Sequence, residues 1–108
     1  MSSTTITRGN SHETFYIAPS LTPSAVAANT TAAQTFPLPG LQTTDIILNG
    51  GYIANQTTGI FTVECDCLTA NVLTIQFGNV TASSATPAAG IYELQIVRAE
   101  GPLPTTAV

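Results

Sequence analysis

Short runs of alternating apolar and polar residues constrain the fold of this chain more than any other feature of its sequence. Near the C-terminus every second residue is large and apolar, and these residues are Tyr92, Leu94 and Ile96. Such alternation predicts a half-buried antiparallel strand, because successive side chains of a strand point to opposite faces of the sheet. Residues 72–78 show the same pattern, and Ala70-Asn71 before them is predicted to be a turn.

A further alternating run contains both cysteines of the chain. It predicts a strand with one face formed by Phe61, Val63, Cys65 and Cys67 and with polar residues on the other face. Along a strand the two cysteines lie about 6.5–7 Å apart, near or beyond the usual Cα separation of a disulfide. We therefore expect two small core residues, with an inter-subunit thiol or a bulged bridge between the two as the alternative.

Turn-forming residues divide the rest of the chain into short extended segments. Pro19 closes a predicted strand at 15–18, and residues 20–23 are expected to form a turn. Residues 24–33 lack a helix start signal and are expected to be extended, while the prolines of 34–40 restrict that segment to an edge strand. The other predicted segments are a buried strand at 45–48, a tight turn at 49–51 and a loop at 81–90.

About six to eight short strands, with turns roughly every 8–12 residues, are typical of a β-sandwich or barrel. We therefore predict an all-β fold, an antiparallel β-sandwich or jelly-roll-like domain over residues 15–100. An extended N-terminal arm over 1–14, part of which is a possible first edge strand, and a C-terminal tail over 101–108 flank it. A chain of 108 residues is the size of one domain.

The composition excludes several classes of function. The chain has six Asp and Glu residues against two arginines and no lysine, for a net charge of −4. Two arginines cannot form the basic stripe that nucleic-acid binding needs. No apolar segment approaches the ~18–20 residues of a membrane span, so no membrane partner is expected. The polar N-terminus lacks the features of a secretory signal, and we expect synthesis in the host cytoplasm.

Threonine, with 19 residues, supplies much of the surface that charged residues form in other proteins. Threonine is β-branched and suits a half-exposed strand. A surface with so few charges costs little free energy to remove from water, and depletion of charge is typical of the cores of protein interfaces. The composition therefore favours a protein that is covered by a partner, with a Thr-rich secreted or surface domain as the alternative.

The sequence contains no set of residues with the spacing of an active site or a metal site. The single histidine, His12, lies beside Glu13 without a nucleophile, so we expect a solvated arm residue. Glu64 and Asp66 are candidates for a carboxylate pair or a calcium site, but no acidic loop with a glycine turn surrounds them. We expect no catalytic residue, no cofactor and no metal, and a small hydrolase or metal-binding domain is the least favoured interpretation.

Three patterns in the C-terminal half belong together. The first is Gly40-Leu41 with Asp45 and an apolar run after it, followed by a loop and the alternating strand Gly59-Ile60-Phe61-Thr62-Val63-Glu64-Cys65. The second is Ala70-Asn71-Val72-Leu73-Thr74-Ile75-Gln76-Phe77-Gly78-Asn79-Val80-Thr81, and the third is Thr86-Pro87-Ala88-Ala89-Gly90-Ile91-Tyr92 followed by Arg98. In this combination, over about residues 36–98, the chain resembles small β-sandwich virion proteins of tailed bacteriophages. Cys65-Asp66-Cys67 departs from the pattern of that group, in which small apolar or polar residues are more typical.

The resemblance implies a β-sandwich without catalytic residues that coats a phage head or attaches to a tail. We expect a capsid decoration, or cement, protein on the virion surface, a homotrimer that binds the major capsid protein and neighbouring copies of itself. Arg98 stands where the resembling proteins also carry arginine, so a structural role is expected for it. The alternative is a head-fibre or tail-associated module that binds host glycans, for which Tyr16 and Tyr52 are the plausible exposed aromatic residues.

The partner contacts are expected at the two ends of the chain, outside the sandwich. The expected contact residues are Ser2, Ser3, Thr4, Thr5, Ile6, Thr7 and Arg8 in the arm, and Gly101, Pro102, Leu103 and Pro104 in the tail. Extended, proline-containing ends suit this task because they can pair with exposed strand edges of other chains.

Overall fold

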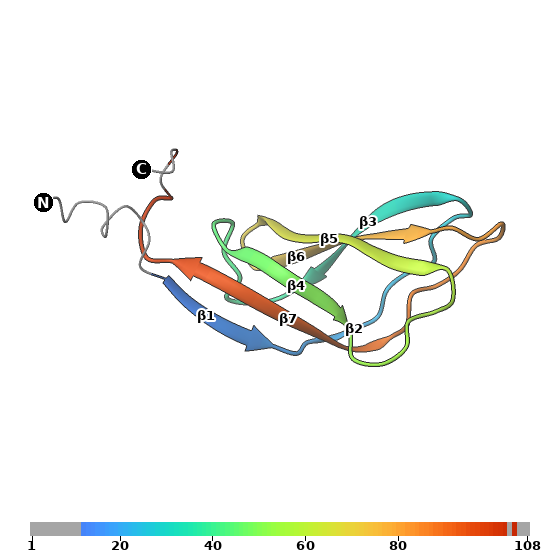
Figure 1. Cartoon of the computed structure of the whole chain (residues 1–108), viewed down its shortest axis with the longest axis horizontal. Helices are drawn as coiled ribbons and strands as arrows, with labels where there is room; N and C mark the ends of the chain where they lie inside the picture. The colour runs from blue at the N-terminus through green and yellow to red at the C-terminus, as the bar shows by residue number, and fades with distance from the viewer. Residues whose placement is uncertain (1–11, 104, 106–108) are drawn as a thin grey trace, which may run out of the picture.

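Seven strands and no helix form in the part of the chain that the computed structural model describes, residues 12–103 and 105. The strands pack as two antiparallel sheets, which confirms the predicted β-sandwich (Figure 1). They are β1 (His12–Ile17), β2 (Ser20–Leu21), β3 (Thr30–Pro37), β4 (Ile46–Tyr52), β5 (Ile60–Thr69), β6 (Val72–Asn79) and β7 (Gly90–Ala99). Because β1 begins at His12, the first sheet extends three residues into the segment expected as an arm.

The first sheet is built around β7. β4 pairs with one edge of β7, while β1 and β2 pair with the other edge in a single register. Pro19 separates β1 from β2 because proline has no N–H to donate, but its carbonyl accepts a hydrogen bond from Tyr92 N at 2.9 Å. The turn expected at 20–23 is therefore wrong, since Ser20–Leu21 continues the edge strand and Leu21 is buried.

The second sheet has β6 at its centre, between β3 and β5. β5 and β6 form a hairpin through the predicted turn at Ala70-Asn71, where Asn71 has a φ of 66°. The side chain of Asn71 also accepts a hydrogen bond from Gly40 N at 2.8 Å, which ties the chain after β3 to this hairpin. β3 pairs only with β6, so it is an edge strand, as its proline predicts.

The core lies between the sheets and is formed mainly by the two central strands. Their six alternating apolar residues are each at most 1% exposed, and they are Leu73, Ile75, Phe77, Tyr92, Leu94 and Ile96. The ring centroid of Tyr92 lies 5.4 Å from that of Tyr52 and 6.2 Å from that of Phe77. The alternation predicted for both strands is therefore confirmed, and Tyr52 is held against the core.

The tight turn expected at 49–51 is wrong, because these residues belong to β4. Gly50 lies where β4 packs closely on its neighbours: a Cβ there would meet Leu94 Cδ2 at 2.7 Å and Cys65 Sγ at 2.9 Å. Glycine is thus needed at this position for close packing rather than for a turn. The chain reverses instead before Ile60, at Gly59, whose φ is 84°.

The single inward face expected for the cysteine-containing strand is also wrong. The pairing of β5 with β6 shifts between Thr62 and Glu64, which leaves Val63 as an extra residue in a β-bulge. Before the bulge Phe61 points outward, and Phe61 and Val63 are each 45% exposed; beyond it, Cys67 is buried. A bulge shifts the two-residue period by one, so apolar residues on its two sides face opposite ways.

β4 is more exposed than its apolar sequence predicts. Ile46 and Leu48 are 41% and 58% exposed, and only Ile47 of the three packs against the core. A register shift in the pairing of β4 with β7, between Ile47 and the residue after Leu48, adds a bulge here. The buried strand expected at 45–48 is therefore wrong for its outward residues, because only the Ile47 side of β4 packs against the core.

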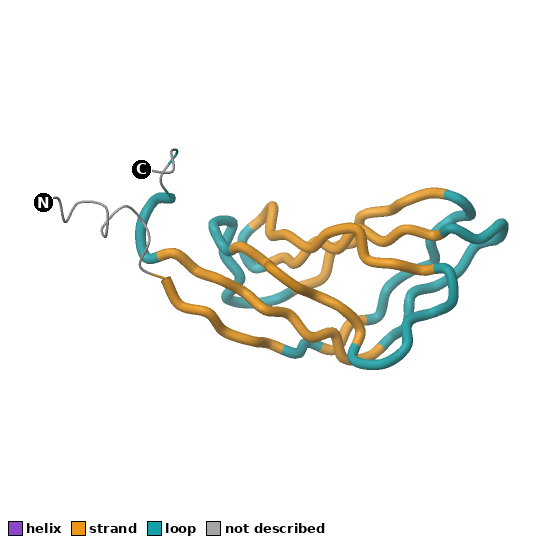
Figure 2. The backbone as a smooth tube through the Cα atoms, in the orientation of Figure 1, coloured by secondary structure: helices purple, strands orange, loops and turns teal. Residues whose placement is uncertain are grey.

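Loops gather at the end of the sandwich opposite the described ends of the chain (Figure 2). Two buried polar side chains fix them. Asn79 donates through Nδ2 to Val26 O and Ser83 O, each at 3.0 Å. Tyr92 donates its hydroxyl proton to Ala88 O at 2.6 Å. Both groups are satisfied although they are buried, so the loop predicted at 81–90 is well anchored.

Candidate interaction surface

The described residues contain no constellation typical of an enzyme. No group of three or more His, Cys, Asp or Glu side chains among them is placed to hold a metal ion. His12 is an exposed residue at the start of β1, opposite Ala99. None of these residues belongs to a helix long and apolar enough to cross a membrane.

Arg98 forms a partly buried ion pair with Asp45 at one end of the core. Its Nε and Nη2 atoms donate to the two carboxylate oxygens of Asp45 at 2.7 and 2.6 Å. Nη2 also donates to Gly40 O at 2.9 Å, and the guanidinium carbon lies 5.0 Å from the ring centroid of Phe15. The hydrogen bond from Arg98 holds the pKa of Asp45 below its ordinary value, and the same bond raises the pKa of Arg98. Arg98 thus has a structural role.

Both cysteines are free thiols. Cys67 is 4% exposed and Cys65 packs against the same core. Burial, together with the neighbouring carboxylates of Asp66 and Glu64, raises the pKa of the Cys65 thiol to about 11. A thiol with such a pKa is almost entirely protonated near neutral pH, so Cys65 is a poor nucleophile and a poor metal ligand. Both cysteines therefore pack at the core as small side chains, as expected from the sequence.

A groove of about 440 Å³ runs between β4 and β5. These two strands belong to different sheets, and each has one edge without a pairing strand among the described residues. Leu48 and Val63, both more than 40% exposed, line the groove together with the carboxylate of Glu64. Unpaired edges with apolar side chains favour contact with another polypeptide.

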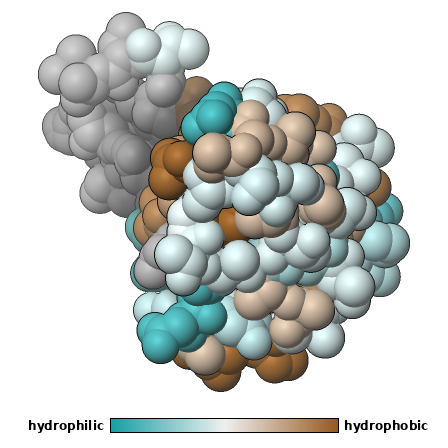
Figure 3. Space-filling model, turned by 90° about the vertical axis from the view of Figure 1, so that its right-hand side faces the viewer, coloured by the Kyte–Doolittle hydropathy of each residue, from teal (hydrophilic) through white to brown (hydrophobic). Residues whose placement is uncertain are grey.

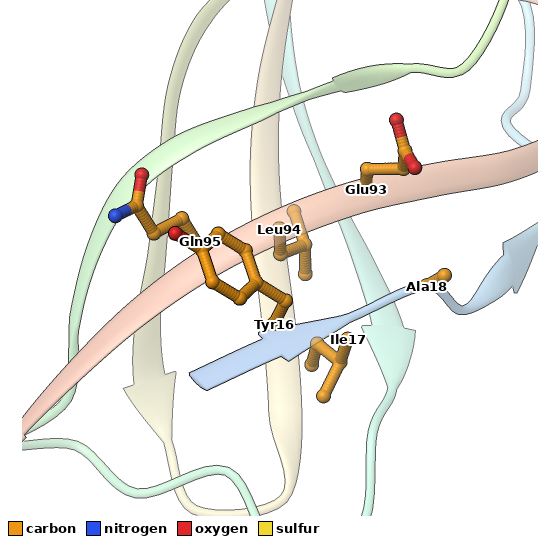
Figure 4. Close-up of a pocket in the computed structure, with 6 residues that line it drawn as sticks. All are labelled: Tyr16, Ile17, Ala18, Glu93, Leu94 and Gln95. Carbon is orange, nitrogen blue, oxygen red and sulfur yellow. The ribbon is translucent and has the colours of Figure 1, made fainter. Parts of the chain in front are cut away.

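A second hollow, of about 380 Å³, lies on the outer face of the first sheet. Figure 4 shows its residues, which all come from β1, the residue after it and β7. Tyr16 is 74% exposed and pairs across the strands with Gln95. Glu93 is exposed on the same face of β7, and the small side chain of Ala18 leaves the space beside it open.

The predicted contact residues at the chain ends are only partly described. Residues 2–8 and Pro104 lie outside the described residues. Gly101, Pro102 and Leu103 follow β7 and are exposed, with Leu103 at 52%. The groove residues Leu48 and Val63 are further exposed candidates for contact, and the sequence alone did not indicate them.

The sequence identified one exposed aromatic residue and missed another. Tyr16 is exposed, as expected, whereas Tyr52 is half-buried and donates its hydroxyl to Ala89 O at 3.3 Å. Phe61 is partly exposed over Gly78 because of the bulge at Val63. The alternation of β7 predicted that Glu93 and Gln95 face outward, but nothing in the sequence indicated that Tyr16 of β1 lies beside them.

Comparison with known proteins finds no relative of this chain: no protein-family model, curated protein or solved structure matches it. The resemblance to phage virion proteins therefore rests on the three sequence patterns alone. Asp45 belongs to the first of these patterns and Arg98 ends the third, and the two residues meet in the ion pair.

Proposed function

We propose that this protein is a non-enzymatic structural protein of a tailed-bacteriophage virion. Its task is to decorate the head by binding the major capsid protein and neighbouring copies of itself, as a trimer. The proposal combines the three sequence patterns with a surface that suits burial against other chains. A head-fibre or tail-associated module is the same class of protein at another place in the virion.

The observation that carries the proposal is the surface of both sheets, which combines little charge with exposed apolar side chains and with strand edges that no described strand pairs with. Exposed large apolar residues occur on strands, loops and tail alike, and they are Tyr16, Ile46, Leu48, Ile53, Phe61, Val63, Leu68, Val80 and Leu103. Isolated exposed apolar residues are common, but strand edges that stay open beside them are usually protected by lysine. This chain has no lysine.

Residues of intermediate hydropathy dominate the view of one end of the molecule, and strongly hydrophilic patches are few there (Figure 3). The described residues hold all six carboxylates of the chain but only one arginine, and that arginine is paired with Asp45. Only 7% of the residues are charged, so most of the surface loses little hydration free energy when a partner covers it. Cement proteins need this property because each copy is covered on several sides.

A glycan-binding module is the second candidate, and one observation favours it: the exposed ring of Tyr16 beside polar side chains. Tyr52, the other aromatic residue considered for such a platform, packs on Tyr92 instead. With one exposed tyrosine rather than two, the glycan interpretation has less support than the structural one.

The test is a binding assay with assembled heads. The full chain is mixed with expanded heads made from the major capsid protein encoded nearest to its gene, and bound protein is measured by co-sedimentation. We expect saturable binding at a fixed ratio to the capsid protein, reduced at least tenfold when residues 2–8 and 101–108 are both deleted. No binding of the full chain would overturn the proposal, and full occupancy by the doubly truncated chain would overturn the assignment of the contacts to the chain ends.

A further inference from the structure

We propose that the hollow beside Tyr16 binds the guanidinium group of an arginine side chain of a partner protein. The inference rests on the proposed function, because it assumes that another polypeptide covers this face of the first sheet. It adds the chemistry of the contact: an aromatic ring for the plane of the guanidinium and a carboxylate for its charge.

The geometry of β1 and β7 places three suitable groups around one space. Tyr16 lies directly opposite Gln95, and Glu93 is two residues from Gln95, on the same face of β7 (Figure 4). Diagonal neighbours on adjacent strands are about 7–8 Å apart, which aromatic and long side chains can span. Next to Glu93 stand Ala18 on one side and Gly51 on the other, so no large side chain fills the gap.

The same chemistry already exists on the inner face of this sheet. Phe15 and Tyr16 are consecutive residues of β1 and therefore point to opposite faces. On the inner face the guanidinium of Arg98 lies 5.0 Å from the Phe15 ring and binds the carboxylate of Asp45. The outer face offers the corresponding ring and carboxylate, Tyr16 and Glu93, and no described residue forms an ion pair with Glu93.

Charge favours a cation over a neutral ligand at this place. The described residues carry six carboxylates against the single guanidinium of Arg98, which is already engaged by Asp45. Arginine suits the hollow better than lysine, because its planar group can stack on a ring while donating to a carboxylate and to the amide oxygen of Gln95. A neutral sugar would use the ring and the amide but would leave the charge of Glu93 uncompensated.

The test is an NMR titration of the full ¹⁵N-labelled chain with the peptide acetyl-Gly-Arg-Gly-amide. The control peptide carries citrulline in place of arginine, which keeps the shape and removes the charge. We expect saturable shifts of the amide signals of Tyr16, Ala18, Glu93 and Gln95 with the arginine peptide, with an affinity at least fivefold weaker for citrulline. The spectra report at the same time that each variant is folded.

Three variants make the assignment specific. Glu93→Gln and Tyr16→Leu, both at exposed positions, should weaken arginine-peptide binding at least fivefold, whereas Glu64→Gln, which removes an exposed carboxylate of β5, should leave it unchanged. Equal binding of the two peptides, an unchanged affinity in Glu93→Gln, or saturable binding of an oligosaccharide at Tyr16 without arginine binding would each overturn the proposal.

The same variants separate this proposal from the proposed function. If the full chain binds assembled heads and both Glu93→Gln and Tyr16→Leu bind them with unchanged affinity, the proposed function stands and the arginine contact is wrong. If the full chain does not bind heads, the proposed function fails even where the peptide titration succeeds. Weaker head binding by both variants supports the two proposals together.

Discussion

Arg98, near the end of the last strand, holds both carboxylate oxygens of Asp45, the residue immediately before β4. The two partners differ in their access to solvent, because the side chain of Asp45 is fully buried while that of Arg98 is 25% exposed. The pair closes one end of the core and joins two strands of the first sheet to the carbonyl of Gly40. Its two halves should therefore respond differently to substitution.

Removal of Arg98 should destabilise the fold more than removal of Asp45. Arg98→Met leaves a buried carboxylate without its counter-charge, for which a loss of about 3–5 kcal/mol is typical. Asp45→Asn leaves a partly exposed guanidinium that can turn to water, so a loss of about 1–3 kcal/mol is expected. Urea unfolding monitored by circular dichroism measures both values. Equal losses, or a larger loss for Asp45→Asn, would contradict the burial asymmetry of the pair.

The same pair should make stability depend on pH in the acid range. The hydrogen bond from Arg98 lowers the pKa of Asp45 below its ordinary value of 3.8. A carboxyl whose pKa is lower in the folded state stabilises the fold at pH values above its unfolded pKa, and this contribution is lost as the pH falls through the folded pKa.

The comparison is between the wild type and Asp45→Asn. The difference in their free energies of unfolding should be largest above about pH 5 and should shrink as the pH is lowered towards about 2. Urea titrations at a series of pH values measure it. A difference that stays constant over this range, or increases towards low pH, is inconsistent with a lowered pKa for Asp45.

Gly50→Ala should destabilise the protein although alanine is tolerated at most strand positions. The added methyl group would meet Leu94 Cδ2 at 2.7 Å and Cys65 Sγ at 2.9 Å, so the core must shift. Overpacking of this kind costs about 1–3 kcal/mol. Gly51→Ala is the matched control, because a Cβ at Gly51 has no neighbour within 4 Å. Thermal unfolding of both variants gives the comparison, and a similar melting temperature for the two would refute the close packing at Gly50.

Cys65 should react slowly with alkylating reagents while the protein is folded. Its pKa is raised to about 11, above the ordinary value of 9.0, chiefly because the thiol is buried. Only the thiolate reacts, so iodoacetamide labelling at pH 8 should be at least tenfold slower in the folded protein than in 6 M urea. Fragment-ion mass spectrometry distinguishes Cys65 from Cys67. Equal labelling rates for Cys65 in the two conditions would show that the thiol is neither buried nor protonated.

The central strands were predictable from the sequence because a strand that is paired along both edges and buried on one face must alternate apolar and polar residues regularly. β6 and β7 are each paired along both edges and present their alternating residues to one core. A one-residue error in register would turn Phe77 or Tyr92 to the solvent, so the two-residue period is preserved there. The all-β class and the hairpin turn at Ala70-Asn71 follow from the same regularity.

The edge strands were less predictable, because their irregularities depend on their neighbours. The bulge at Val63 reverses the face of Phe61, and no local residue type marks it. Gly50 has the sequence context of a tight turn, and only its closeness to Leu94 and Cys65 reveals a packing role. Such contacts join residues that are far apart in the sequence.

The hollow beside Tyr16 could not be predicted from the sequence for the same reason. Alternation predicted that Glu93 and Gln95 face away from the core, and Tyr16 was recognised as exposed. Their juxtaposition depends on the register of β1 against β7, which brings together residues far apart in the sequence; Tyr16 and Gln95, for example, are 79 positions apart. The ion pair of Asp45 with Arg98 depends on the pairing of β4 with β7 in the same way, so neither arrangement could be read from one sequence.

The proposed role of this chain as a structural component of a virion can be tested directly by measuring its amount in purified particles. Virions produced from the genome that encodes the chain would be purified on a density gradient and analysed by quantitative mass spectrometry. We expect a constant molar ratio of this chain to the major capsid protein, unchanged between full particles and empty heads. Absence of the chain from particles, or an amount that falls with each purification step, would contradict a structural role in the virion.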